Sequence, residues 1–306
     1  MTTMAVITPS YRPDLAGFRR LHASVRRHTD ADVKHHVIVP GRDAPLYRGI
    51  GSDRLVVWTY QDVLPAGLTP TDRLAAATRR VPGLPASFNC AAINWRRPWK
   101  PVRGWVLQQI VKMCLVDHVE GDVFVNIDSD VVLVRRLGPE HVVHGGTVRL
   151  YTREESIGPG MRHYQWAETA HELLGLPFEQ EDSYPDHIAG LVSWDPRLLR
   201  ACLDRVKEVS GMPWGPAIAE RLRFSEDILY GTFVRAFGSE QDLRFQRDTT
   251  LCHSYWETEA MAADQVECFV AEFKDEDCAV HIQSNTDTDD RVFSAVVERL
   301  SGASPR

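Results

Sequence analysis

The segment from Gly121 to Val134 constrains the fold of this 306-residue chain more than any other. It opens with a turn signal, runs through apolar and β-branched residues, breaks at Asp128-Ser129-Asp130 and then turns apolar again. An almost wholly apolar run of this length is typical of a strand covered on both faces, as in a parallel sheet. The sequence therefore predicts an α/β fold in which this segment forms a central strand.

Two carboxylates, those of Asp128 and Asp130, follow at the carboxyl end of that strand. Open α/β sheets bind their ligands at this edge. Paired acids are costly there unless a positive group joins them, and a hard divalent cation is the usual one. A bare Asp-x-Asp pattern often does no more than end a strand in a polar turn. The buried strand that precedes it here favours a metal site instead.

Length and charge narrow the class of protein. A chain of 306 residues can bury a large core, as one large α/β domain or two small ones. The net charge of -7 argues against nucleic-acid binding. No apolar run approaches the roughly 20 residues that span a bilayer, and the N-terminal one is too short for a signal peptide. The six cysteines show no zinc spacing, so we expect free thiols in a cytoplasmic protein.

The N-terminal pattern predicts the first half of a nucleotide-binding α/β unit. A strand at Met4–Thr8 precedes a helix from Asp14 to His28, and further strands follow at residues 37–39 and 55–58. Polar residues stand after each of these strands, near the expected edge of the sheet: Ser10, Tyr11, Asp43 and Asp62. Ordinary loop polarity explains the two aspartates equally well.

The stretch from Pro65 to Arg103 is irregular and rich in proline, and it ends in tryptophans interleaved with basic residues such as Arg96 and Arg97. Such a cluster in an acidic chain suits a diphosphate, or a loop that closes over one. The next residues, from Gly104 to His118, predict a helix.

The polar side chains of this helix are Gln108, Gln109 and Lys112. Spacing alone favours a solvent-facing stripe. Because the helix leads into the central strand, the same stripe is also a candidate lining for the ligand cleft.

In the second half, Gly190 lies inside a predicted strand at residues 187–194, which indicates a bulge or a close approach to a ligand. Glu226 and Asp227 follow Ser225 at a predicted helix start, where a serine cap and acids in the first turn are stabilising by themselves. His253 and His281 lie in two late segments, and a lone histidine is more often structural than a ligand.

Four short motifs together resemble those of a known family: Gly104-Trp105-(x2)-Gln108-Gln109-(x2)-Lys112, Asp128-Ser129-Asp130, Ile7-Thr8-Pro9-Ser10-Tyr11 and Ile282-Gln283-Ser284-Asn285. The chain resembles the DUF6492 group, an uncharacterised bacterial family whose members look like nucleotide-sugar-dependent glycosyltransferases with the GT-A fold. The resemblance implies one GT-A-like domain with a mostly parallel mixed sheet flanked by helices. Residues 1–135 would form the nucleotide-sugar half, and residues 136–306 the acceptor half with a closing C-terminal segment.

The same resemblance implies a sugar donor, a UDP-sugar before a GDP-sugar, an acceptor with a hydroxyl group, and Mn²⁺ or Mg²⁺. Aromatic residues in the acceptor half, Tyr164 and Trp166, could form a sugar platform, although such spacing more often marks core. The base that deprotonates the acceptor would be Asp227 or Glu226. The metal ligands would be Asp128, Asp130 and His281, with His253 as the alternative to His281. The residues expected to contact the nucleotide sugar are Ser10, Tyr11, Asp62, Gln108, Gln109, Lys112, Asp128 and Ser129.

Two other functions stay open. The strand with Asp128 and Asp130 also fits haloacid-dehalogenase-type phosphatases, in which the first aspartate is a phosphoryl nucleophile. Those enzymes carry the motif near the N-terminus and a later acidic pair on another strand, whereas here the motif is mid-chain and Asp289-Asp290 opens a predicted helix. A carbohydrate-binding protein that kept the fold and lost turnover is the second alternative.

Overall fold

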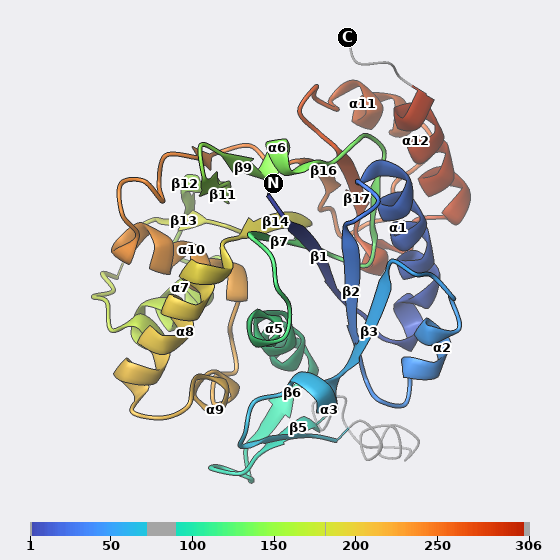
Figure 1. Cartoon of the computed structure of the whole chain (residues 1–306). Coiled ribbons are helices and arrows are strands. Elements are labelled where there is room, and N and C mark those ends of the chain that lie inside the picture. The colour runs from blue at the N-terminus through green and yellow to red at the C-terminus, as the bar shows by residue number, and fades with distance from the viewer. Residues whose placement is uncertain (1, 72–89, 181, 303–306) are drawn as a thin grey trace.

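A five-stranded sheet runs through the middle of the computed structural model, which describes residues 2–71, 90–180 and 182–302 (Figure 1). The strand order is β14-β7-β1-β2-β3. Four strands are parallel, and the edge strand β14 runs antiparallel to β7. The predicted α/β fold with a parallel-rich central sheet is thereby confirmed, in mixed form. The strands are β1 (Met4–Pro9), β2 (Lys34–Val39), β3 (Leu55–Thr59), β7 (Val123–Ile127) and β14 (Leu191–Trp194).

Helices α1 (Leu15–His28) and α5 (Gly104–Cys114) cover opposite faces of this sheet and make β1 and β7 the most buried strands. Alternate residues of a strand point to opposite faces. Accordingly Val6 packs in one core with residues of α1, while Ile7 packs in another with residues of α5. Burial on both faces explains the almost wholly apolar pattern of the central strand, which only Asn126 interrupts.

Helix α5 differs from the expectation in having almost no solvent-facing side. It lies between the central sheet and a group of four helices (Figure 1). Gln109 and Lys112 are only 4% and 7% exposed, so the expected solvent-facing stripe is wrong. The helix also ends at Cys114, followed by a 3-10 turn at Leu115–Asp117. The four helices are α7 (Tyr164–Leu174), α8 (Pro196–Ser210), α9 (Trp214–Ala219) and α10 (Glu226–Phe237).

A second, three-stranded sheet begins where the central strand ends. The chain leaves β7, passes through Asp128-Ser129-Asp130 and enters β8 (Val131–Leu133). β8 pairs antiparallel with β17 (Ala279–Ile282), which pairs parallel with β16 (Cys252–Tyr255). Helices α11 (Val266–Ala271) and α12 (Asp290–Gly302) pack on this sheet. The paired acids therefore lie at the junction of two sheets.

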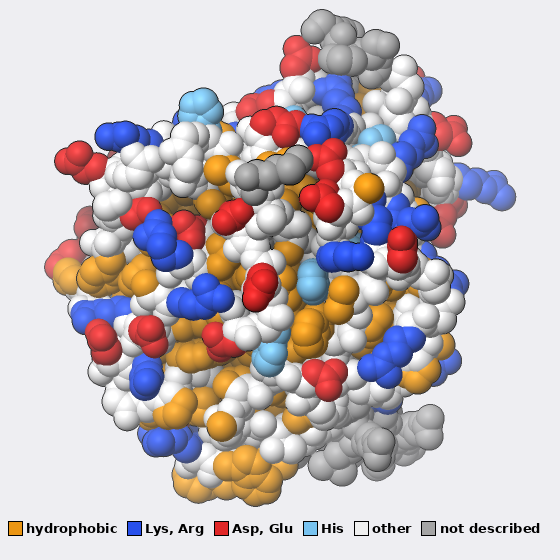
Figure 2. Space-filling model, viewed as in Figure 1, with side chains coloured by type: hydrophobic (Ala, Val, Ile, Leu, Met, Phe, Trp, Pro, Cys, Tyr) orange, Lys and Arg blue, Asp and Glu red, His pale blue; other side chains and the backbone are white. Residues whose placement is uncertain are grey.

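The region expected to be irregular contains a small antiparallel sheet of β4 (Leu68–Pro70), β5 (Cys90–Asn94) and β6 (Pro101–Arg103). Residues 72–89 of that region lie outside the described residues. Hydrophobic side chains gather over this sheet at the lower edge of the molecule (Figure 2). Trp95 and Trp99, between β5 and β6, are 61% and 74% exposed. Arg97, in the cluster that the sequence suggests for a diphosphate, forms an ion pair with Glu220 at 3.1 Å.

The remaining elements are short. Residues 147–151 contain two short strands, and a third follows at residues 153–157. Within the described residues no helix is long and apolar enough to cross a membrane. All six cysteines are free, as expected. These short elements are η1 (Arg12–Asp14), α2 (Ala44–Arg48), α3 (Tyr60–Val63), α6 (Pro139–Val142), β9 (Val143–His144), β10 (Thr147–Val148), β11 (Leu150–Tyr151), β12 (Arg153–Ile157), β13 (Tyr184–Asp186), β15 (Gln246–Arg247) and η4 (Ser284–Thr286).

Candidate active site

Asp130 is held from two sides at the junction of the two sheets. One carboxylate oxygen lies 3.3 Å from Nε2 of His281, and the other accepts a hydrogen bond from the backbone N–H of Ser284 at 3.0 Å. Burial alone would raise the pKa of Asp130, but the hydrogen bond and charge of His281 and the Ser284 N–H outweigh it, so the pKa is lowered. Asp130 is therefore an anion fixed in one orientation.

His281 is positioned by a close approach of backbone. A Cβ on Gly190 would lie 3.2 Å from Cγ of His281, so only glycine lets the imidazole pack there without displacement. Trp256 covers the ring from another side, with 4.6 Å between ring centroids. Nδ1 of His281 is buried and has no hydrogen-bond partner among the described residues. Gly190 lies just before β14 and not inside a strand, and it closely approaches His281, whereas the sequence indicated a bulge or an approach to a ligand.

His253, the alternative histidine, points to the other face of the second sheet. Ser254, and not His253, is the register partner of His281, and neighbouring residues of a strand face opposite sides. Nε2 of His253 lies 2.9 Å from the carbonyl oxygen of Phe269, and its ring packs on that phenyl group. The structure therefore brings His281, and not His253, to Asp130.

Asp128 faces a buried lysine. Nζ of Lys112 lies 3.2 Å from Oδ1 of Asp128 and 2.8 Å from Oε1 of Glu226. Burial lowers the pKa of Lys112, but the charges of Asp128 and Glu226 outweigh burial, so the pKa is raised. The side-chain amide of Gln109 lies against the Glu226 carboxylate and donates to it in the orientation that satisfies both groups. Lys112 thus joins the central strand to helix α10.

Asp227 is the unsatisfied member of this buried group. Ser225 caps α10 by accepting from the N–H of Ile228, as expected, and Asp227 lies in the first turn. Its Oδ1 is buried without a hydrogen-bond partner in the described part of the chain. Burial and the charge of Glu226 raise its pKa far more than Lys112 lowers it. One cation facing three carboxyl groups leaves Asp227 as the group that holds a proton.

Asp14 was missed by the sequence reasoning. It precedes α1, yet its side chain makes no cap and instead accepts a hydrogen bond from Ser129 at 3.3 Å. Burial and the charge of Asp130 raise its pKa to about 6. A cavity of about 190 Å³ lies here between the start of α1, the turn of the paired acids and the segment after β17. A helix-start aspartate carries no sequence signal for this placement.

The close packing of α1 on the paired acids depends on Gly17. A Cβ there would lie 2.9 Å from the carbonyl oxygen of Ser129. Gly17→Ala is therefore expected to lower the free energy of unfolding by about 1–3 kcal/mol, because backbone must move. Gly104→Ala, in α5 with open space around it, is expected to change it by less than about 1 kcal/mol. Urea unfolding of both variants measures this, and equal effects would contradict the packing described.

The other predicted contact residues lie in varied surroundings. Ser10 is buried at the end of β1 and bonds to the hydroxyl of Tyr47, which donates to the carbonyl of Tyr11. Asp62 is exposed and caps α3 through the N–H and hydroxyl of Thr59. Gln108 is half-buried on α5. Their roles toward a nucleotide stay predictions.

The residues expected to bind metal fit a divalent cation in chemistry but are not fully gathered. Two carboxylates and an imidazole suit Mn²⁺, and Nδ1 of His281 is an unused acceptor or donor. In the described ranges, however, no three His, Cys, Asp or Glu side chains are arranged to hold an ion. Asp130 meets His281, whereas Asp128 is turned to Lys112. Metal binding by Asp128 would require its carboxylate to contact the ion as well as Lys112.

A comparison with known protein families agrees with the family resemblance that the four motifs indicate. The model of a family of unknown function, DUF6492, matches residues 4–302, and the chain belongs to this family. No curated protein sequence is significantly similar. Among solved structures, the apo form of mouse xyloside xylosyltransferase 1 is similar with a TM-score of 0.45 and 11% identity, over 94% of this chain and 99% of that one. A similarity this low identifies neither fold nor activity.

Proposed function

We propose that this member of the DUF6492 family is a metal-dependent glycosyltransferase with a GT-A-like fold, which moves a sugar from a nucleoside-diphosphate sugar to an acceptor hydroxyl. The observation that carries the proposal is the placement of Asp130. It is a fixed anion beside His281, at the carboxyl edge of a parallel sheet and at the rim of a cavity. The mostly parallel mixed sheet is also what a GT-A-like fold requires.

The proposed metal ligands are Asp130, His281 and Asp128. A divalent cation held by these residues would neutralise the diphosphate and favour its departure. The hydrogen bond from Ser284 and the contact with Gly190 hold Asp130 and His281 in place before any ligand arrives. Such preorganisation lowers the free energy needed to assemble a site.

The proposed diphosphate site lies next to Lys112. This lysine is charged, because Asp128 and Glu226 raise its pKa. Its ammonium group is fixed by both carboxylates and can attract the negative charge that develops on the leaving diphosphate. The side chain of Ser129, at the rim of the cavity, is placed to contact the nucleotide sugar.

The proposed base is Asp227. Glu226 is engaged by Lys112, whereas Asp227 has an oxygen without a partner. In its ionised form Asp227 would take the proton of the acceptor hydroxyl while that oxygen bonds to the anomeric carbon. The bond from the anomeric carbon to the diphosphate breaks, and its electron pair leaves with the diphosphate. A raised pKa makes ionised Asp227 a stronger base than an exposed aspartate.

Thermal unfolding with Mn²⁺ and UDP tests the proposal. Ligand at 100 times its dissociation constant should raise the free energy of unfolding by about 2.7 kcal/mol, and the melting temperature with it. The Asp130→Ala variant should lose the Mn²⁺-dependent part of this shift. Asp204→Ala, which removes an exposed carboxylate on α8, is the matched control and should keep it. An unchanged shift in Asp130→Ala would refute the metal assignment.

Turnover separates the three functions that the sequence allows. Slow, Mn²⁺-dependent hydrolysis of a sugar nucleotide to nucleoside diphosphate is expected of the transferase. Release of inorganic phosphate from monoesters would indicate a phosphatase with Asp128 as nucleophile. Saccharide binding without any turnover would indicate a carbohydrate-binding protein.

A further inference from the structure

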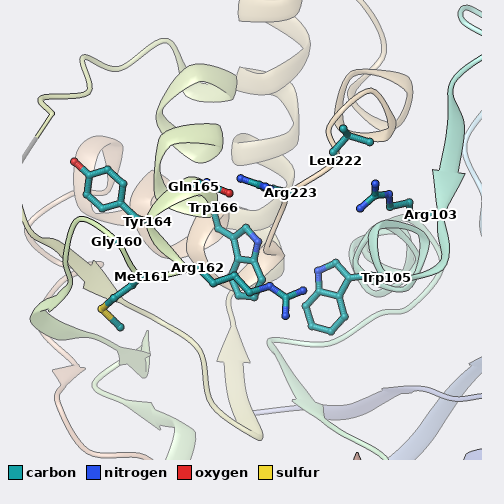
Figure 3. Close-up of a pocket in the computed structure, with 10 residues that line it drawn as sticks. All are labelled: Arg103, Trp105, Gly160, Met161, Arg162, Tyr164, Gln165, Trp166, Leu222 and Arg223. Atoms are coloured by element: carbon teal, nitrogen blue, oxygen red, sulfur yellow. The ribbon is translucent and has the colours of Figure 1, made fainter. Parts of the chain in front are cut away.

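A second cavity, of about 530 Å³, opens at the start of α5 (Figure 3). Three separate segments line it: the beginning of α5, the first turn of α7 with the loop before it, and the residues just before α10. Its volume is in the range of small-ligand sites. The cavity is distinct from the one beside Asp130, with which it shares no lining residue.

Aromatic side chains form the centre of this cavity. The rings of Trp105 and Trp166 are 5.9 Å apart and 22° from parallel. Trp166 is nearly buried, but Trp105 is 48% exposed, held by a hydrogen bond from its indole N–H to the carbonyl of Phe224 at 3.0 Å. A large, rigid and accessible ring with a polar anchor is a platform for the apolar face of a sugar. Trp166 therefore belongs to the hydrophobic core and also lines the cavity.

The charge of the cavity is opposite to that of the protein. Three arginines line it, Arg103, Arg162 and Arg223, and the described lining includes no Asp or Glu. The whole chain has 42 acidic and 35 basic residues. None of the three arginines forms an ion pair with another described residue. In Figure 3 the Arg162 side chain extends toward the ring of Trp105, and its guanidinium lies 5.6 Å from that of Trp166. Unpaired guanidinium groups favour an anionic ligand.

One face of α5 connects this cavity to the buried lysine. Trp105, Gln109 and Lys112 are spaced at i, i+4 and i+7, so they lie on the same face. Seven residues of α-helix rise about 10 Å. Along that face the chain before α10 runs beside α5, from the contact of Trp105 with Phe224 to that of Lys112 with Glu226. A saccharide that contacts Trp105 in the cavity therefore lies about 10 Å along α5 from the buried Lys112.

We propose that this cavity binds the acceptor, and that the acceptor is an anionic saccharide, whose sugar ring rests on Trp105 and whose carboxylate or phosphate pairs with Arg103, Arg162 or Arg223. The identification of the ligand as an acceptor rests on the function proposed above. The binding of an anionic saccharide does not.

Calorimetric titration without metal or sugar nucleotide tests the site. The probes form two pairs. Anionic trigalacturonate is compared with neutral maltotriose, and anionic glucose 6-phosphate is compared with neutral glucose. At least one anionic probe should bind more tightly than its neutral partner. Arg162→Gln should weaken that binding about tenfold, as expected for one charged hydrogen bond. Arg19→Gln, which removes an exposed arginine on α1, should leave it unchanged. Trp105→Ala should weaken it further, and Trp105→Phe should restore part of it.

Equal binding of anionic and neutral probes, or no binding at all, would overturn the proposal, as would affinity that Arg162→Gln leaves unchanged. Binding of UDP that depends on Arg162 would overturn the acceptor assignment, because the cavity would then belong to the nucleotide. If only the transferase proposal fails, Mn²⁺ and UDP will not shift the melting temperature, while the saccharide titration still succeeds.

Discussion

Replacing Lys112 with methionine is expected to lower the free energy of unfolding by about 3–5 kcal/mol at pH 7. The lysine is 7% exposed and joins Asp128 to Glu226, which is itself 1% exposed. Methionine keeps the length and helix propensity of the side chain, so the loss reports chiefly the buried Glu226 carboxylate left without its cation. Urea unfolding monitored by circular dichroism measures it.

Lys207→Met is the control, because Lys207 is exposed near the end of α8, and it should change stability by less than about 0.5 kcal/mol. Without Lys112, its charge no longer lowers the pKa of Asp227, so that pKa rises still further above the unfolded value and the variant keeps losing stability to a higher pH than the wild type. Its deficit should therefore be smaller at pH 5 than at pH 8. A deficit like that of Lys207→Met would contradict the buried ion pair.

Asp227→Asn is expected to stabilise the protein and to inactivate it. The folded state raises the pKa of Asp227, so it holds a proton that the unfolded chain releases above about pH 4. Stability of the wild type therefore falls as pH rises, by about 1.4 kcal/mol per pH unit between the two pKa values. Asparagine needs no proton, so the gain in the variant should grow from pH 5 to pH 7.

Transfer by the same variant should be about 10²–10⁴-fold slower, the usual contribution of a general base. Wild-type activity should rise with pH as Asp227 ionises. Asp204→Asn, at an exposed position of α8, is the control for both measurements. A stability difference that does not depend on pH would contradict the buried carboxyl. Full activity in Asp227→Asn would show that Asp227 is not the base.

Local patterns were sufficient to predict the framework of the site. The apolar run at Val123–Ile127, which only Asn126 interrupts, is a consequence of burial on both faces, and that burial is what the structure shows. Helix α1 follows from its apolar spacing, and the cap at Ser225 from its chemistry. These features depend on residues close together in the chain, which is why the sequence reveals them.

Contacts between distant segments were not predictable in this way. Spacing within α5 predicted a solvent-facing polar stripe. Such spacing does not show that Glu226, 114 residues after Lys112, covers the lysine. The second cavity is built from residues near 103, 162 and 223, and the sequence does not show that these three distant segments meet. Asp14 resembles a helix cap and yet faces Ser129.

A crystal structure with Mn²⁺ and UDP, with data collected at the manganese absorption edge, tests the central claim most directly. The account predicts an anomalous peak coordinated by Asp130 and His281, with Asp128 beside it and the diphosphate of UDP on its other side. Bound UDP with no such peak, or a peak held by other residues, would contradict it.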